Sequence, residues 1–169
     1  IDPQPVHAIV TNSTYDGLCY NVRRIKELLG ESVDRLHFDE AWYGYARFNP
    51  LYAERFAMYG DPKDYDRGGP SVFATQSTHK LLAAFSQASM IHVRDGRRPI
   101  EHKRFNEAFM MHASTSPFYP IIASNDISAA MMSLRKSSFR PILNAGFCIR
   151  TKNGTVSAIL KMAGACLTR

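Results

Sequence analysis

The chain has 169 residues, 45% of them hydrophobic, which is enough for one domain with a core of its own. Its net charge of +6 could indicate a nucleic-acid partner, but the charge is unevenly distributed. Residues 1–132 carry 14 basic and 15 acidic residues, whereas residues 133–169 carry seven basic residues and no acidic one. The basic excess therefore belongs to the last segment, and we expect the rest of the chain to bind neither nucleic acid nor a membrane.

Further classes are disfavoured by the apolar runs and the cysteines. No apolar run approaches the ~20 residues of a membrane helix, and no secretory signal is visible. Cys19, Cys148 and Cys166 form neither a disulfide framework nor a metal-spaced cluster, so we expect a cytoplasmic protein without a metal site. The chain begins at Ile1 rather than at a methionine, and we expect it to be a piece of something larger.

The first part of the chain has the pattern of an α/β fold. We expect strands at residues 6–11 and 35–41 with an amphipathic helix at 20–29 between them, ended by Gly30. Short connections from strand to helix to strand predict parallel pairing with a right-handed crossover.

The elements that follow are predicted from apolar periodicity and turn residues. They are a short helix at 50–58, a polar loop at 60–70, strands at 72–75 and 88–93, and helices at 101–111 and 125–132. Asn125 or Asp126 is the expected cap of the last helix. Beyond it, Asn153-Gly154 indicates a hairpin-like turn, and residues 158–165 form a run of small residues.

Chemically informative residues follow two of the predicted strands. Asp39 ends one strand, and Lys80 follows another as part of Ser-x-His-Lys. Ligands of open α/β sheets bind at the carboxyl ends of the strands, so the two residues should lie together. A lysine amine that is neutral because it is buried can form a Schiff base with an aldehyde cofactor, so we expect Lys80 to be buried. Ser77 and His79 are suited to hold a phosphate. Pyridoxal 5'-phosphate (PLP) requires both functions.

The sequence around these residues resembles a known family. Thr75–Phe85, continued through Ser89, is similar to the cofactor-attachment motif of the bacterial ornithine/lysine/arginine decarboxylases, which are PLP-dependent enzymes of fold type I. Other segments also resemble this family, namely Thr11–Gly17, His37–Trp42, Tyr43–Pro50, Met110–His112 and Ser114–Pro117. The resemblance covers roughly residues 6–132. It implies part of a large domain of the aspartate aminotransferase type, with a mostly parallel sheet and flanking helices.

The resemblance also implies roles for individual residues. Lys80 would form the Schiff base with PLP, and Asp39 would pair with the pyridine nitrogen so that the ring becomes an electron sink. Ala41 would lie against the ring face. Ser77 and His79 would bind the phosphate.

Two further assignments stay open between a functional and a structural role. Trp42 is expected either beside the cofactor or in the core. Ser116, with Ser114 and Thr115, is either a donor to the phosphate site of a neighbouring subunit or part of an ordinary connector. In the full-length family we expect a homo-oligomer, a dimer or larger.

The implied reaction is the decarboxylation of arginine, lysine or ornithine to its amine and carbon dioxide. Tyr43–Pro50 looks more like the arginine enzymes and Thr75–Val93 more like the lysine enzymes, so the substrate stays open. A PLP aminotransferase would share the lysine and the aspartate, but the sequence around Lys80 favours a decarboxylase.

The alternatives to an enzyme come from what surrounds the motifs. Family members have an upstream phosphate loop and a ring-stacking residue that cannot be placed in residues 1–36, and residues 133–169 show no resemblance to the family. A frameshift, a truncated gene or an unrelated fused end would explain that tail. The chain could therefore be an inactive remnant, or a non-enzymatic partner of such a decarboxylase. A binder of anionic surfaces through the basic tail is the third alternative.

Overall fold

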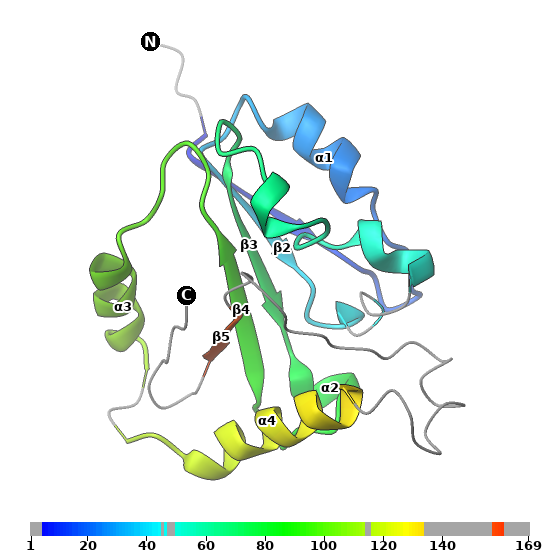
Figure 1. Cartoon of the computed structure of the whole chain (residues 1–169), viewed down its shortest axis with the longest axis vertical. Coiled ribbons are helices and arrows are strands. Elements are labelled where there is room, and N and C mark those ends of the chain that lie inside the picture. The colour runs from blue at the N-terminus through cyan, green and yellow to red at the C-terminus, as the bar shows by residue number, and fades with distance from the viewer. Residues whose placement is uncertain (1–4, 45, 47–49, 114–115, 134–156, 161–169) are drawn as a thin grey trace.

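The computed structural model describes residues 5–44, 46, 50–113, 116–133 and 157–160 (Figure 1). Five strands form one sheet in the order β1-β2-β3-β4-β5, with helices around it. The strands are β1 (His7–Thr11), β2 (Arg35–Asp39), β3 (Ser71–Gln76), β4 (Ser89–Arg94) and β5 (Ser157–Leu160). The helices are α1 (Val22–Leu29), α2 (Thr78–Leu81), α3 (His102–Met110) and α4 (Tyr119–Ser133), with 3-10 turns η2 (Pro50–Arg55) and η3 (Pro62–Asp64). The predicted α/β class is confirmed.

The first three strands run parallel and start in register. His7 pairs with Arg35, and Arg35 pairs with Ser71. The predicted parallel pairing of the first two strands is therefore confirmed. β4 reverses direction and pairs antiparallel with β3, and β5 is antiparallel to β4. The twelve residues between β3 and β4 hold only the four-residue helix α2, too little for the covering helix of a parallel crossover.

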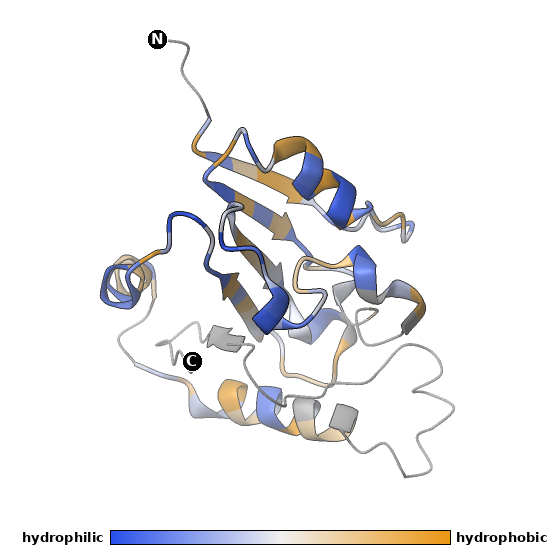
Figure 2. Ribbon diagram, turned by 45° about the horizontal axis from the view of Figure 1, so that its top comes forward, coloured by the Kyte–Doolittle hydropathy of each residue, from blue (hydrophilic) through white to orange (hydrophobic). Residues whose placement is uncertain are grey.

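The core lies between α1 and the parallel strands. Asn21 caps α1 by accepting the Arg24 amide at 3.1 Å, and Gly30 ends the helix as predicted. Hydropathy alternates along the strands (Figure 2), because successive side chains point to opposite faces. The core is formed by the buried residues Val22, Val33, Leu36, Phe38, Ala57, Val72 and Ala74.

Two predicted helices differ from the structure. The last one begins at Tyr119, not near Asn125, so Asn125 and Asp126 lie inside α4 and neither caps it. Pro120 is tolerated in the first turn, where its missing N–H has no helical partner to serve. The segment expected as a helix at 50–58 is a 3-10 turn that ends at Arg55.

The structure describes only part of the tail for which predictions were made. Residues 157–160 form β5, while Asn153-Gly154 and residues 161–165 lie outside the described residues. Among the helices that the structure describes, none has the length and apolarity to cross a membrane.

Candidate functional site

The carboxyl ends of the three parallel strands meet at one edge of the sheet. Thr11, Asp39 and Thr75 are laterally paired there. The ladder continues one residue further, because the Asn12 amide donates to the Asp39 carbonyl at 2.7 Å and the Glu40 amide donates to the Thr75 carbonyl at 2.9 Å. The residues that follow β2 and β3 therefore start from neighbouring positions.

Asp39 is half-buried at this edge. Its Oδ1 accepts the amide of Ala41 at 3.1 Å, while Oδ2 has no hydrogen-bond partner among the described residues. Thr75 lies beside Asp39, and its hydroxyl is 3.1 Å from Nε2 of His37. Burial lowers the pKa of His37, with His7 adding to the effect and Asp39 opposing it. One oxygen of Asp39 is thus held by the loop and the other is available to a ligand.

The segment after β3 carries the other predicted cofactor residues. Ser77 stands at the N-cap of α2, but its hydroxyl makes no capping bond. Nδ1 of His79 is 2.8 Å from the carbonyl oxygen of Ala88, so Nδ1 carries the proton and donates it. Lys80 is exposed, not buried as expected for a neutral amine. In the neutral ring of His79 the remaining nitrogen, Nε2, only accepts, and it can donate to a phosphate when the ring is protonated.

A small hollow lies between the two segments. It is lined by Glu40, Ala41, Trp42, Gly44, Gln76, Ser77 and Leu82. Trp42 also packs edge-on against Tyr15, with ring centroids 5.0 Å apart. The structure thus brings three predicted residues, Ala41, Trp42 and Ser77, around one hollow.

The remaining predicted residues lie outside that hollow. Asp39 is at the same sheet edge, whereas His79 and Lys80 do not line the hollow. Ser116 is exposed, and its neighbours Ser114 and Thr115 lie outside the described residues. The described residues hold part of a pocket that fits PLP chemically: a carboxylate oxygen of Asp39 with no partner among them, a serine hydroxyl unused in capping, and a small side chain beside a hollow.

A row of buried polar residues behind this edge was not predicted. Glu40 is fully buried: its Oε1 accepts the Ala57 amide at 2.6 Å and its Oε2 accepts Nε2 of Gln76 at 3.2 Å. Burial raises the pKa of Glu40 to about 7, although hydrogen bonds from Ala57, Gln76 and Asn12 and the charge of Lys26 oppose the rise. The signal was present in the sequence: Asp39 and Glu40 are adjacent in an extended segment, so they point to opposite faces and one of them must enter the core.

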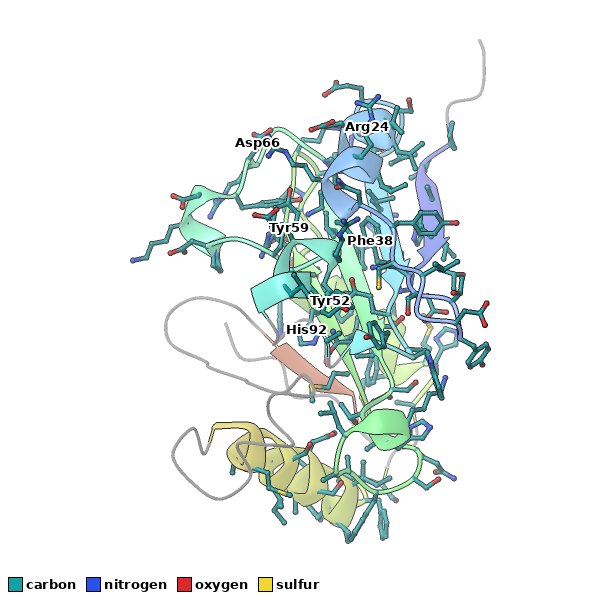
Figure 3. All side chains as sticks on the ribbon, turned by 90° about the vertical axis from the view of Figure 1, so that its right-hand side faces the viewer. Arg24, Phe38, Tyr52, Tyr59, Asp66 and His92 are labelled. Carbon is teal, nitrogen blue, oxygen red and sulfur yellow. The ribbon has the colours of Figure 1, made fainter. Side chains whose placement is uncertain are left out.

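The row continues onto β4. Oε1 of Gln76 is 3.3 Å from Nε2 of His92, and the other ring nitrogen, Nδ1, is buried without a partner in the part of the chain that the structure describes. Burial lowers the pKa of His92 to about 4. Figure 3 shows His92 together with Phe38 and Tyr59 among the side chains of the molecule. Within the described residues, no group of three His, Cys, Asp or Glu side chains could hold a metal ion.

The comparison with known proteins identifies the class to which this edge belongs. The family model described as "Orn/Lys/Arg decarboxylase, major domain" matches residues 2–161. The chain therefore belongs to the Orn/Lys/Arg decarboxylase family. The match reaches past residue 132 and includes part of the segment in which no resemblance was expected.

Individual relatives agree with this membership. The chain is 62% identical over 129 residues to the biodegradative arginine decarboxylase of Escherichia coli (strain K12), covering 76% of this chain and 17% of that protein. It is also 62% identical over 132 residues to a lysine decarboxylase of Pseudomonas aeruginosa, covering 78% of this chain and 17% of that protein. The solved structure of E. coli constitutive lysine decarboxylase superposes with a TM-score of 0.69 and 48% identity, over 83% of this chain and 18% of that chain. The chain thus spans about a sixth of the length of these relatives.

Proposed function

We propose that this chain forms part of a PLP-dependent decarboxylase that converts a basic amino acid to its amine and carbon dioxide. The observation that carries the proposal is the meeting of the ends of β2 and β3 at one sheet edge, where Asp39 lies beside Thr75 and where Ala41 and Ser77 line a hollow. Membership in the decarboxylase family supports the reaction class.

The proposed roles follow from the groups that each side chain offers. Lys80 attaches the cofactor through its Nζ, and Oδ2 of Asp39 holds the proton of the pyridine nitrogen. When bound, PLP supplies an electron sink for the carbanion that is left when the carboxylate departs as carbon dioxide. Ala41 leaves room for a flat ring, and Trp42 closes the side of the hollow.

Phosphate binding is proposed for Ser77 and His79. The serine hydroxyl donates directly. His79 donates through Nε2 as an imidazolium, while its Nδ1 stays on the Ala88 carbonyl. The position of the His79 ring is thus set by a hydrogen bond that phosphate binding does not need to break. Ser116 of one copy is proposed to reach the phosphate of a neighbouring copy in a dimer or larger assembly.

The substrate class is proposed only as arginine, lysine or ornithine. The identity to an arginine decarboxylase and to a lysine decarboxylase is the same, 62%, so similarity does not favour either. The activity also belongs to proteins of which this chain covers about a sixth, and the groups that select the substrate side chain need not lie in this chain.

The experiment is covalent trapping of the cofactor. The purified chain is incubated with PLP and reduced with borohydride, and the labelled peptide is mapped by mass spectrometry. We expect one pyridoxyl group on Lys80, none in Lys80→Ala, and an unchanged yield in Lys103→Ala, whose lysine is exposed on α3. A decarboxylase assay on the three amino acids follows. No label, or label scattered over surface lysines, would refute cofactor attachment by this chain and support the inactive remnant.

A further inference from the structure

Three polar side chains, two of them buried and one half-buried, form a row directly behind the proposed cofactor edge. Asn12, Glu40 and Gln76 occupy the positions that follow β1, follow β2 and end β3, one residue beyond the paired Thr11, Asp39 and Thr75. We call them the polar rung. Strand alternation turns the polar rung toward the core, on the side opposite to Asp39.

Glu40 is the centre of the polar rung. A buried carboxylate is costly unless it is hydrogen-bonded, and Glu40 receives donors from two separate segments. Ala57, beyond η2, donates its amide at 2.6 Å, and Gln76 of β3 donates its side-chain amide at 3.2 Å. Asn12, one residue beyond β1, donates its Nδ2 to the Arg55 carbonyl at 2.8 Å. The carboxylate of Glu40 thus joins the end of β2 to β3 and to the loop beyond η2.

Gln76 is fixed on more than one side. Its Nε2 bonds to Glu40 and its Oε1 faces His92 at 3.3 Å. Gly44 packs closely against it: a Cβ there would lie 3.0 Å from Cδ and 3.1 Å from Nε2 of Gln76. The amide of Gln76 is therefore held from two sides, by Glu40 and by His92, and the next residue along the chain is Ser77.

We propose that Glu40 is a positioning residue: its carboxylate fixes the spacing between Asp39–Ala41, at the end of β2, and Ser77–Lys80, beyond β3. This inference rests on the proposed function for its meaning, because these are the two segments that would hold the cofactor. Glu40 also lines the hollow, but it is almost fully buried, and its two carboxylate oxygens already accept from Ala57 and Gln76.

The first test uses the chain without cofactor, by amide hydrogen exchange. Glu40→Gln keeps the size of the side chain but offers a single acceptor oxygen, so one of its two donors loses its partner. We expect exchange to rise about tenfold or more at the Ala41 and Lys80 amides, which are bonded within the two segments. The Gly30 and Ser71 amides, at the opposite end of the sheet, serve as internal controls. Equal acceleration at both ends would mean a purely global loss of stability and would overturn the proposal.

Two further variants separate positioning from stability. Gln76→Met removes the link of Glu40 to β3, together with the contact between Gln76 and His92, so it should release the Lys80 amide while the Ala57 amide stays protected by Glu40. The double variant Glu40→Gln with Gln76→Glu swaps the two side chains and restores a carboxylate–amide pair. Its hydrogen-exchange rates should return to within about twofold of wild type. If Glu40→Gln does not fold, the hydrogen-exchange rates of Gln76→Met and of the double variant decide whether Glu40 positions the two segments.

The last arm adds the cofactor. The yield of borohydride trapping on Lys80 should fall about tenfold in Glu40→Gln and recover in the double variant with swapped side chains. A wild-type chain that takes no label on Lys80 would refute the proposed function, while the exchange rates still decide whether Glu40 positions the edge. Normal trapping in Glu40→Gln, beside a wild type that is labelled, would overturn the positioning role alone.

Discussion

Two groups enclosed in the fold should make opposing contributions to the pH dependence of stability in the mildly acidic range. The first is Glu40, whose pKa burial raises from its ordinary 4.5 to about 7. Between these values the folded chain keeps a proton on Glu40 that the unfolded chain has released. The unfolded state then binds fewer protons, so the free energy of unfolding falls as pH rises.

The second group is His92, which acts in the opposite direction. Burial lowers its pKa from the ordinary 6.5 to about 4. The ring nitrogens are enclosed even though the residue as a whole is only half-buried, because Nδ1 is buried and Nε2 faces Gln76. Between pH 4 and 6.5 the unfolded chain holds a proton that the folded chain lacks, so the free energy of unfolding rises with pH.

The two contributions are of similar size. Each pKa differs from its ordinary value by about 2.5, which corresponds to about 3 kcal/mol for each group at full development. Their windows overlap between pH 4.5 and 6.5, where the opposing slopes cancel. Glu40→Gln should unmask His92, and the stability of the variant should rise by roughly 3 kcal/mol across this overlap. His92→Leu should unmask Glu40 and give a fall of similar size.

Urea unfolding followed by circular dichroism, repeated through the overlap, measures these slopes by linear extrapolation. The informative quantity is the difference between each variant and wild type at the same pH, because all other titrating groups then cancel. The double variant Glu40→Gln with His92→Leu is the control, and its free energy of unfolding should again depend on pH as that of wild type does. Slopes equal to that of wild type in both single variants would refute the assignment of the two perturbed groups.

Three further changes have effects that follow from packing and charge. Burial, and after it the charge of Arg94, lower the pKa of Lys26 to about 7, so the free energy of unfolding of wild type should rise between pH 7 and 10.5. Lys26→Met should remove that rise, as urea unfolding in this range would show. Phe38→Ala should cost about 3–5 kcal/mol in the same assay, since the ring is fully buried in the core. Gly44→Ala should cost about 1–3 kcal/mol, because the new Cβ meets an amide of Gln76 that is held in place; no loss would mean that Gln76 can move.

The sequence was informative where local pattern decides structure. Residues 22–29 repeat apolar side chains at helical spacing between Asn21 and Gly30, and the structure has α1 at those residues. The short connections on either side of α1 leave parallel pairing as the simple solution, and β1 and β2 pair in that way. Asp39 was placed at the end of a strand by its apolar neighbours alone.

The sequence was less informative where distant contacts decide. Asn125 reads as a helix cap, yet Oδ1 of this fully buried side chain accepts the hydroxyl of Thr78 at 2.7 Å, a partner 47 residues away. The Nδ1 bond of His79 to Ala88 depends in the same way on the return of the chain into β4. Lys80 was expected to be buried and is exposed.

The adjacent carboxylates Asp39 and Glu40 show why motif and core are hard to separate at this edge. They differ by one methylene and by one position along an extended segment, and alternation sends them to opposite faces of the sheet. The half-buried carboxylate of Asp39 keeps one oxygen open at the edge, whereas that of Glu40 is enclosed and its pKa is raised to about 7. Asp39 is the residue proposed to contact the cofactor, so the motif alone assigns no role to Glu40. Glu40 still needs partners, since a carboxylate taken out of water must be satisfied by its neighbours. The partners that satisfy it, the Ala57 amide and Gln76, belong to the segments that set the geometry around Asp39 and Ser77.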